Sequence, residues 1–317
     1  MSRAGIVALI GRPNVGKSTL MNQLIGDKIS IITPMAQTTR NQIRGIQNHE
    51  QGQIVYLDTP GIHRPKKQLN RYMVDVAFHS LDGVDMALYL IDASRPDSNI
   101  LPEAKSRNSR DPGVGEDEMI IERLKEINVP CFLVINKVDL IGKKVGLLPL
   151  IEAYSKRGNF KEVIPISATT REGLDSLVDE MFRLLPEGEP IFPPEYSTDR
   201  AEKFLVSELV REKVILGTRE EVPHSCAVIV ENFDESTRDN DGQGIIYIDA
   251  TVHVERDSQK GILIGKKGSK LKEIGSLARA DIEKLLGCKV FLKLWVKVDK
   301  NWSQNTRSLH RLGYRDL

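Results

Sequence analysis

The chain has 317 residues, a length that suggests about two domains, each large enough to bury a core of its own. Hydrophobic residues make up 40% of it and charged residues 28%, which indicates a soluble globular protein and excludes a disordered chain. The 45 Lys and Arg residues and the 44 Asp and Glu residues leave a net charge of +1, so the chain as a whole is neither acidic nor basic.

The first part of the chain, residues 1–185, alternates short apolar runs with longer segments of helical period. We expect strands at Ile6–Ile10, Gln53–Asp58, Met86–Asp92, Pro130–Asn136 and Val163–Ile166. Such alternation predicts an α/β domain with a mostly parallel sheet that is covered by helices on both faces. In this architecture ligands bind at the carboxyl ends of the strands.

A phosphate-binding loop follows the first predicted strand. The sequence GRPNVGKS fits the pattern GxxxxGK[ST] between a strand and a helix. Its glycines let successive backbone N–H groups point at phosphate oxygens, Lys17 places a cation against the β- and γ-phosphates, and the Ser18 hydroxyl can bind Mg²⁺. The phosphate-binding candidates here are Gly11, Arg12, Pro13, Asn14, Val15, Gly16, Lys17, Ser18 and Thr19.

A polar stretch from Thr33 to Gln47 contains Gln37-Thr-Thr-Arg40. One threonine must complete the Mg²⁺ shell in the triphosphate state if Thr38, Thr39 and Arg40 form switch I. We favour Thr39, with Thr38 as the alternative. The other interpretation of this stretch is a simple Thr-rich turn.

A second phosphate-site element closes the next long hydrophobic strand, in the order Asp58, Thr59, Pro60, Gly61. The Asp58 carboxylate can hold Mg²⁺ through its water shell, and the backbone N–H of Gly61 can bond the γ-phosphate. Alone, this string would be consistent with an ordinary turn. Its position after the strand that follows the phosphate-binding loop favours the functional interpretation.

Two further strand ends carry candidates for base recognition. Asn136, Lys137 and Asp139 follow one strand, and Ser167, Ala168 and Thr169 follow the next. A carboxylate such as that of Asp139 can accept hydrogen bonds from N1–H and the 2-amino group of guanine, which adenine cannot offer. The four motifs in this order therefore favour GTP over ATP.

Residues 101–115, LPEAKSRNSRDPGVG, are polar and rich in Pro, Gly and Ser, so we expect a surface loop.

Residues 186–198 hold a Pro-rich linker, PEGEPIFPP, that cannot continue a helix. A second domain, residues 199–300, shows the order α-β-β-α-α-β, and residues 301–317 form a C-terminal tail. The expected elements of the second domain are a helix near Thr198, strands at Cys226–Glu231, Ile245–Val254 and Val290–Val298, and helical pieces near Ile262–Ile264 and at Ser269–Leu286.

Charge is distributed unevenly between the two parts. Residues 256–317 contain 15 Lys and Arg residues against 6 Asp and Glu residues, a net charge of +9, and the rest of the chain carries −8. This asymmetry favours an anionic partner for the second domain. The alternative is a basic surface that only promotes solubility.

A G-x-x-G loop lies inside the basic segment, between an apolar helical turn and a second helix. Such a loop lets a nucleic-acid strand approach the backbone, its lysines contact phosphates, and the adjacent apolar groove admits unstacked bases. A plain helix–helix turn is the alternative. The RNA-binding candidates are Ile262, Ile264, Gly265, Lys266, Lys267, Gly268, Lys270 and Lys272.

The last strand, KVFLKLWVKV, alternates lysines on one face with aliphatic residues on the other. We interpret it as an ordinary half-buried strand. Phe291 and Trp295 share the lysine face, where they could stack on a base, but we expect them to be packing partners.

Cys131, Cys226 and Cys288 have neither zinc-site nor disulfide spacing, so we expect a reducing compartment. The first residues carry no basic leader, so we expect no export and no membrane span.

Together, GRPNVGKS, TTR, DTPG, NKVD and SAT, followed by the linker and the GKKG loop, resemble the Era family of bacterial GTPases over nearly the whole chain. The resemblance implies a P-loop GTPase domain followed by a type II KH domain. It implies binding of GTP with Mg²⁺ and slow hydrolysis to GDP and phosphate. It further implies binding of the 3′ end of 16S ribosomal RNA through the KH domain during maturation of the small (30S) ribosomal subunit. The resemblance also implies a cytoplasmic location, with peripheral association of some members at the inner face of the cell membrane. The sequence shows no coiled-coil heptads, so we expect a monomer.

Ile62 follows Gly61, where Ras-like enzymes carry the glutamine that orients the attacking water. This resembles GTPases in which Asn14 of the phosphate-binding loop is associated with K⁺. Residues 101–115 depart from the usual pattern of the family as an insertion. Two alternatives to an RNA-binding GTPase are a GTPase that modifies tRNA or acts in signalling, and an RNA-binding protein that only binds nucleotide.

Overall fold

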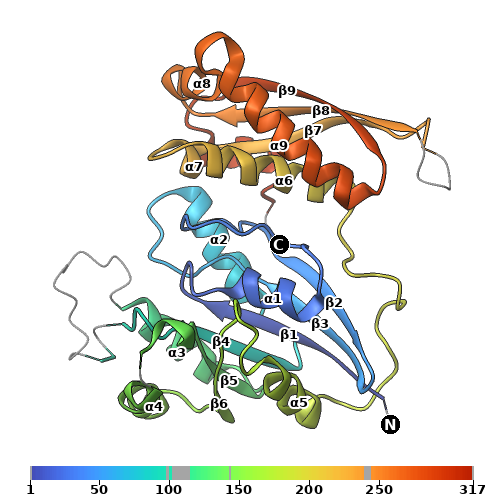
Figure 1. The fold of residues 1–317 in the computed structure, drawn as a ribbon. Helices are drawn as coiled ribbons and strands as arrows, with labels where there is room; N and C mark the ends of the chain where they lie inside the picture. Colours follow the sequence, from blue (N-terminus) through green and yellow to red (C-terminus); the bar gives the residue numbers. More distant parts are fainter. Residues whose placement is uncertain (1, 98–99, 102–114, 143, 239–243, 316–317) are drawn as a thin grey trace.

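The computed structural model describes residues 2–97, 100–101, 115–142, 144–238 and 244–315. Most of the predicted loop at 101–115 therefore lies outside the described residues. The chain forms two bodies, one above the other in Figure 1, and the linker runs along one side from the lower body to the upper.

The lower body contains a six-stranded sheet with the order β2-β3-β1-β4-β5-β6. All neighbouring strands are parallel except β2, which pairs antiparallel with β3. The strands are β1 Arg3–Gly11, β2 Ile43–His49, β3 Gly52–Asp58, β4 Met86–Asp92, β5 Cys131–Asn136 and β6 Glu162–Pro165. The five predicted strands are present, and the parallel sheet is confirmed.

Strand β2 was not predicted from the sequence, because four of its seven residues are polar and they do not alternate regularly with apolar ones. Only Ile43, Gly45 and Ile46 of its seven residues are buried. It is the edge strand of the sheet, and on its far side Ile46 N–H donates to the Ser197 carbonyl at 2.8 Å and the Arg44 carbonyl accepts from the Thr198 hydroxyl at 2.6 Å. Backbone pairing rather than an apolar pattern therefore defines it.

Helices cover both faces of this sheet (Figure 1). The helices are α1 Lys17–Ile25, α2 Gln68–His79, α3 Glu116–Glu126, α4 Leu148–Ser155 and α5 Leu174–Leu184. Apolar side chains of α1 and α5 bury one face, and those of α2, α3 and α4 bury the other. Burial on both sides explains the near-continuous apolar sequence of β4 and β5.

Gln53 of β3 fixes the course of the linker. Its Nε2 donates to the Phe192 carbonyl at 2.8 Å, and its Oε1 accepts from the N–H groups of Ile191 at 2.8 Å and Phe192 at 2.9 Å. The linker is thus held along the lower body before it enters the upper body.

The upper body is a three-stranded sheet, β7-β8-β9, with helices on one face. Its elements are α6 Glu202–Gly217, α7 Val222–Ser225, β7 Ala227–Asp234, β8 Ile245–Val254, α8 Asp257–Ile264, α9 Ser269–Leu286 and β9 Lys289–Val298. Strand β8 pairs antiparallel with β7 and parallel with β9. The short helix α7 is added to the predicted order α-β-β-α-α-β.

Residues that follow β9 fold back onto the upper body. A short 3-10 helix, Trp302–Gln304, and helix α10, Thr306–Arg311, bring Trp302 and Tyr314 into a buried cluster with Leu69 and Met73 of α2. The C-terminal segment therefore packs between the sheet of the upper body and a helix of the lower one. None of the helices within the described ranges combines the length and apolar character that a membrane crossing needs.

Candidate nucleotide site and nucleic-acid interface

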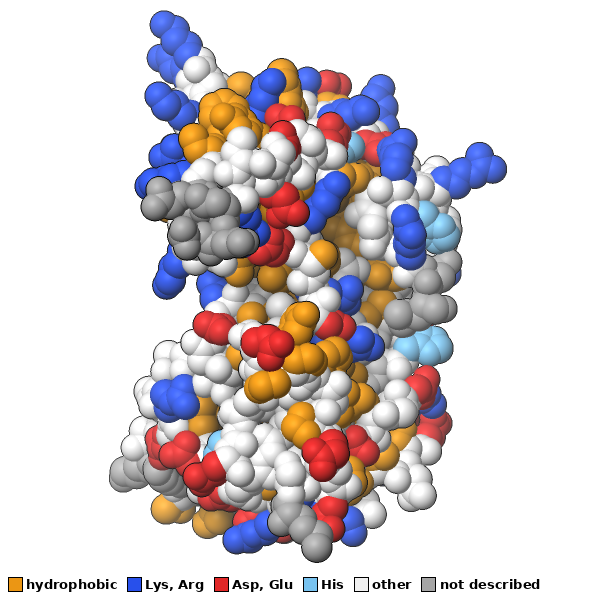
Figure 2. Space-filling view, turned by 90° about the vertical axis from the view of Figure 1, so that its right-hand side faces the viewer, with side chains coloured by type: hydrophobic (Ala, Val, Ile, Leu, Met, Phe, Trp, Pro, Cys, Tyr) orange, Lys and Arg blue, Asp and Glu red, His pale blue; other side chains and the backbone are white. Residues whose placement is uncertain are grey.

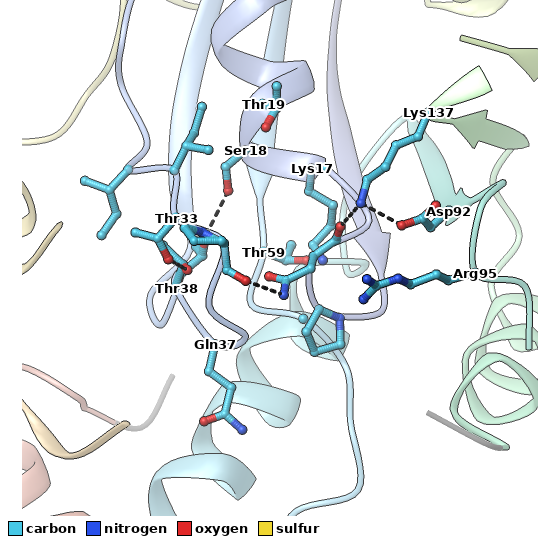
Figure 3. A pocket seen from close by; sticks show the side chains of 18 of the residues that line it. Lys17, Ser18, Thr19, Thr33, Gln37, Thr38, Thr59, Asp92, Arg95 and Lys137 are labelled. Atoms are coloured by element: carbon cyan, nitrogen blue, oxygen red, sulfur yellow. Dashed lines mark hydrogen bonds and ion pairs between the residues drawn. The ribbon is translucent and has the colours of Figure 1, made fainter. Parts of the chain in front are cut away.

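A cavity of about 450 Å³ lies at the carboxyl ends of the lower body's parallel strands (Figure 3). It is bordered by the loop before α1, by residues 31–39 and by the ends of β3 and β4. The described side chains that line it include Asn14, Lys17, Ser18, Thr19, Thr38, Thr39, Thr59, Asp92, Arg95 and Lys137. The structure thus brings the separate sequence motifs to one place.

The phosphate-binding loop approaches the base-recognition motif at Gly16. A Cβ at Gly16 would lie 2.2 Å from Nδ2 of Asn136, and Gly16 has a φ of 102°, so a side chain is excluded on both grounds. The same Asn136 amide donates to the Val15 carbonyl at 2.8 Å. Helix α1 begins directly afterwards at Lys17, so its N-terminal N–H groups face the cavity.

Lys17 is the buried cation of the cavity. Its ammonium donates to the carbonyl oxygens of Gly11 and Arg12, both at 3.0 Å. Burial lowers the pKa of Lys17 to about 8, and the nearby carboxylate of Asp58 acts in the opposite direction. An anion in the cavity would stabilise the charged form of this side chain.

Ser18, Thr39 and Asp58 form an oxygen cluster at the base of the cavity. Ser18 Oγ donates to Asp58 Oδ2 at 2.7 Å and lies 2.9 Å from Thr39 Oγ1, which lies 3.3 Å from the same carboxylate oxygen. Ser30 Oγ also donates to that oxygen at 2.8 Å. Asp58 Oδ1 is buried and has no hydrogen-bond partner among the described residues.

This arrangement fits Mg²⁺, which prefers oxygen ligands and a near-octahedral shell with several waters. Burial raises the pKa of Asp58, and a bound cation would favour its charged form. Thr38 lies elsewhere, with its hydroxyl 2.6 Å from Thr33 Oγ1 and donating to the Met35 carbonyl at 2.8 Å. Of the two threonine candidates, Thr39 is thus the one that belongs to the oxygen cluster.

The segment from Asp58 to Gly61 runs against the phosphate-binding loop. A Cβ at Gly61 would lie 2.6 Å from Cα of Pro13, and the N–H of Ile62 donates to the Gly11 carbonyl at 3.1 Å. The side chain of Ile62 is completely buried in the core between the sheet and α2, α3 and α4. It therefore points away from the cavity.

His63 is a neighbour of the cavity that the sequence analysis missed. Its Nδ1 lies 2.8 Å from the Gly61 carbonyl, and its Nε2 lies 3.0 Å from Gln37 Nε2 and 2.8 Å from Asn70 Nδ2. Burial lowers the pKa of His63, so the neutral ring is favoured. Its position two residues after Gly61 is the feature of the sequence that could have identified it as a neighbour of the cavity.

The base-recognition motif is held by the buried Asn136. Its Oδ1 accepts from the N–H groups of Lys137 at 2.8 Å and Ala168 at 2.9 Å, which ties the two predicted motifs together. Ser167 and Ala168 are buried, whereas Asp139 and Thr169 are exposed, and Lys137 and Leu140 on either side of Asp139 line the cavity. A carboxylate at Asp139 is thus accessible to a ligand.

Asp92 is a second residue that the analysis missed. Its carboxylate lies 2.6 Å from the ammonium of Lys137, which also donates to the Asn14 carbonyl at 2.7 Å (Figure 3). Asp92 ends β4 at the same edge of the sheet as Asp58 and Asn136 end their strands, and this position was its signal in the sequence.

The G-x-x-G loop lies at the tip of the upper body, between α8 and α9. Lys266, Lys267 and Lys272 are exposed, and the side chain of Ile262 is 54% exposed. Ile264 is partly buried, and Lys270 pairs with Glu273 at 3.0 Å. Figure 2 shows Lys and Arg side chains projecting outward from the upper body. An anionic strand can therefore approach the loop without displacing an ion pair of Lys266 or Lys267 among the described residues.

Arg40, predicted as part of switch I, is buried in the upper body. Its guanidinium donates to the carbonyls of Cys226 at 2.6 Å and Pro223 at 3.1 Å and to the Tyr314 hydroxyl at 3.1 Å. It also lies over the ring of Trp302, 5.8 Å from the centroid. Arg40 thus joins the segment beside the oxygen cluster to the upper body, a role that a single sequence does not reveal.

Arg211 of α6 makes the reciprocal contact. Its Nη2 donates to the Thr38 carbonyl at 2.6 Å, and its Nε donates to Glu208 at 2.8 Å. Arg211 is 1% exposed, and the adjacent Glu208 carboxylate raises its pKa. The two arginines fix residues 38–40 between the cavity and the upper body.

Known proteins resemble both bodies. Residues 6–137 match the family described as 50S ribosome-binding GTPase, and residues 221–303 match the KH domain family. GTPase Era of Geotalea uraniireducens strain Rf4 is 48% identical over 312 residues, which cover 98% of each chain. GTPase Era of Staphylococcus haemolyticus strain JCSC1435 is 45% identical over 312 residues, which cover 98% of this chain and 97% of the relative.

Two solved structures are similar over almost the entire chain. Era in complex with MgGDPNP and nucleotides 1506–1542 of 16S ribosomal RNA is 41% identical, with 100% of both chains covered and a TM-score of 0.88. An Aquifex aeolicus Era variant bound to GDP·AlF4⁻ is 40% identical, with 99% of this chain and 100% of its own covered and a TM-score of 0.87. These likenesses confirm the predicted fold class, a P-loop GTPase domain followed by a KH domain.

Proposed function

The chain belongs to the Era family of GTPases, and we propose from this premise that it binds GTP with Mg²⁺, hydrolyses it to GDP and phosphate, and binds ribosomal RNA. The observation that carries the proposal is the meeting of Ser18, Thr39 and Asp58 beside the buried ammonium of Lys17, with Asp139 exposed beside residues that line the cavity.

Within the lower body, each group has a distinct task. The backbone N–H groups of residues 14–18 and the Lys17 ammonium bind the phosphates. Ser18 and Thr39 would hold Mg²⁺ directly and Asp58 would hold it through water, while Thr59 and Pro60 shape the turn that would bring the Gly61 N–H to the γ-phosphate. When bound, Mg²⁺ neutralises charge on the β- and γ-phosphates.

Guanine selection is assigned to the motifs at the ends of β5 and β6. The Asp139 carboxylate accepts the N1–H and 2-amino protons of guanine, and Lys137 lies beneath the base. Asn136 holds the neighbouring loops in place, because its side-chain amide forms hydrogen bonds with the backbone of Val15, Lys137 and Ala168. Ser167 and Thr169 complete the loop around the base.

Hydrolysis rests on positioning and electrostatics rather than on a side chain that orients water at residue 62. Ile62 is fully buried and carries no polar group. We therefore expect slow intrinsic turnover, with K⁺ bound near Asn14 adding positive charge in the transition state. The Asn14 amide donates to the Pro34 carbonyl at 3.1 Å, which places it beside the segment that carries Thr39.

For the upper body we propose binding of the 3′ end of 16S ribosomal RNA and a role in maturation of the small ribosomal subunit. Support comes from the exposed lysines of the G-x-x-G loop and from the 41% identity to the Era chain solved with nucleotides 1506–1542 of that RNA. Ile262 and Ile264 would line the groove for bases, and Lys266, Lys267, Lys270 and Lys272 would contact phosphates.

We infer a cytoplasmic location, since GTP and ribosomal RNA are found there and the described cysteines are free and buried. Peripheral association with the membrane and a monomeric state remain predictions. The proposed domain bounds are 1–185 for the GTPase domain, 186–198 for the linker and 199–300 for the KH domain.

The proposal is tested by measuring GTP hydrolysis with and without a single-stranded RNA that copies the 3′ end of 16S ribosomal RNA. We expect RNA to accelerate turnover in the wild type and to lose this effect in Lys266→Glu/Lys267→Glu. Turnover that is intact but never stimulated would remove the ribosomal RNA and leave a GTPase with another partner. RNA binding without any hydrolysis would leave a protein that only binds nucleotide.

A further inference from the structure

The outer face of the upper sheet carries exposed aromatic side chains. Phe291 is 57%, Trp295 54% and Tyr247 44% exposed, on the two neighbouring strands β8 and β9. Phe291 packs against Tyr247, with ring centroids 5.7 Å apart, but Phe291 and Trp295 both stay exposed on the sheet surface, so the prediction that they are packing partners holds only in part. Burying apolar area is favourable, so three large rings left open on one face indicate a surface made for a partner.

The face is open because the C-terminal segment covers only part of it. Helices α8 and α9 pack on the opposite face, where Ile274 and Ile282 contact the core. On the outer face, Thr251 and His253 are 4% and 5% exposed, and the cluster around Trp302 covers the adjacent part of β7. The outer face stays exposed along β9, including Trp295 and Lys297, which pair with Thr251 and His253, and at Tyr247 in the first half of β8.

The exposed part of this face also carries lysines. Lys289, Lys293 and Lys297 alternate with the aromatic residues along β9 and are exposed. The Lys293 ammonium lies 5.0 Å from the Trp295 ring centroid, and no ion pair of these three lysines is found among the described residues. Acidic residues also lie on this face: Asp249 opposite Lys293, Asp234 opposite Tyr247, and Glu231, which accepts a hydrogen bond from the Thr251 hydroxyl at 2.9 Å.

We propose that this surface, formed by Tyr247, Phe291, Lys293, Trp295 and Lys297, is a second RNA-binding site. Unpaired bases stack on the aromatic rings, and the lysines contact the phosphates between them. Alternating rings and cations are what a single strand requires, because every base has a π-face and every nucleotide a phosphate. An apolar protein partner or a second copy would leave the lysines unpaired at the interface.

This site is separate from the G-x-x-G loop, because α8 and α9, which flank the loop, lie across the sheet from it. The inference rests on the proposed RNA binding of the upper body. It adds a second contact that lengthens the bound strand and is independent of the loop lysines.

The test measures the affinity of the full chain for an RNA that copies nucleotides 1506–1542 of 16S ribosomal RNA, at several salt concentrations. We expect Trp295→Ala/Lys293→Ala to weaken binding about tenfold and to flatten the salt dependence. Trp295→Phe should retain most of the affinity. The matched control is Tyr196→Ala/Lys161→Ala, which removes an exposed aromatic residue and an exposed lysine elsewhere and should leave binding unchanged.

Fluorescence gives a second readout, because the chain has two tryptophans and Trp302 is fully buried. Bound RNA should quench emission in the wild type and fail to quench it in Trp295→Phe. Wild-type affinity in Trp295→Ala/Lys293→Ala, together with weakened binding in Lys266→Glu/Lys267→Glu, would overturn this inference and leave the proposed function standing. Absence of RNA binding by the wild type would overturn both.

Discussion

Arg211 of the KH domain donates a hydrogen bond at 2.6 Å to the main-chain carbonyl of Thr38, the residue before the threonine that faces Ser18 and Asp58. A shift of Thr39 toward or away from a bound cation must move this carbonyl. The KH domain is therefore in contact with the segment that we propose as switch I. We propose that this contact lets each ligand change the affinity for the other.

Replacing Arg211 by Ala should lower the free energy of unfolding by about 3 kcal/mol, because Glu208 would lose its partner in a buried setting. Chemical denaturation measures this change. The double variant Arg211→Met/Glu208→Leu removes both charges and should recover most of the lost stability. Equal stability of Arg211→Ala and the wild type would contradict the burial argument.

Thr39→Ala should weaken the Mg²⁺-dependent binding of a GTP analogue about tenfold and leave GDP binding almost unchanged, because Thr39 is placed to complete the cation shell only in the triphosphate state. Titration calorimetry with and without Mg²⁺ measures both affinities. Thr38→Ala is the matched control, since its hydroxyl bonds Thr33 and Met35 instead. A larger effect at Thr38 would reverse the assignment.

Asp139→Asn should weaken GTP binding more than tenfold and shift preference toward XTP, because an amide can donate to the 2-oxo group of xanthine where the carboxylate accepted from guanine. Competition of GTP, ITP and XTP for one site provides the measurement. The exposed position of Asp139 makes a loss of stability small, which separates recognition from folding. An unchanged order of the three nucleotides would exclude Asp139 from base recognition.

Asn14→Asp should change the dependence of turnover on the monovalent cation, because a new carboxylate alters the charge around the proposed K⁺. Hydrolysis by the wild type should be faster in KCl than in NaCl at equal ionic strength. Equal rates in the two salts, with no effect of the substitution, would remove K⁺ from the mechanism.

Much of this fold was predictable because its strands are buried on both faces and read as uninterrupted apolar runs, as in Met86–Asp92. Motif position predicted the cavity, since Gly16, Asp58 and Asn136 all follow or end such strands. The edge strand Ile43–His49 escaped prediction because backbone pairing defines it more than side-chain burial does.

Contacts between the domains were not predictable for a different reason. Arg40 and Arg211 lie 171 positions apart, and each donates to main-chain carbonyls of the other domain, which leave no trace in a residue pattern. Phe291 and Trp295 look like core residues by type. Only the path of the C-terminal segment shows that their part of the sheet remains open.

The most direct test of coupling between the two domains is the affinity for RNA copying the 3′ end of 16S ribosomal RNA, measured with GDP and with a GTP analogue bound. The wild type should bind the RNA at least fivefold more tightly in one nucleotide state, a ratio at the lower end of typical allosteric coupling of about 5- to 150-fold. Arg211→Met/Glu208→Leu should bind it equally in both. Equal affinities in the two states of the wild type would contradict the coupling.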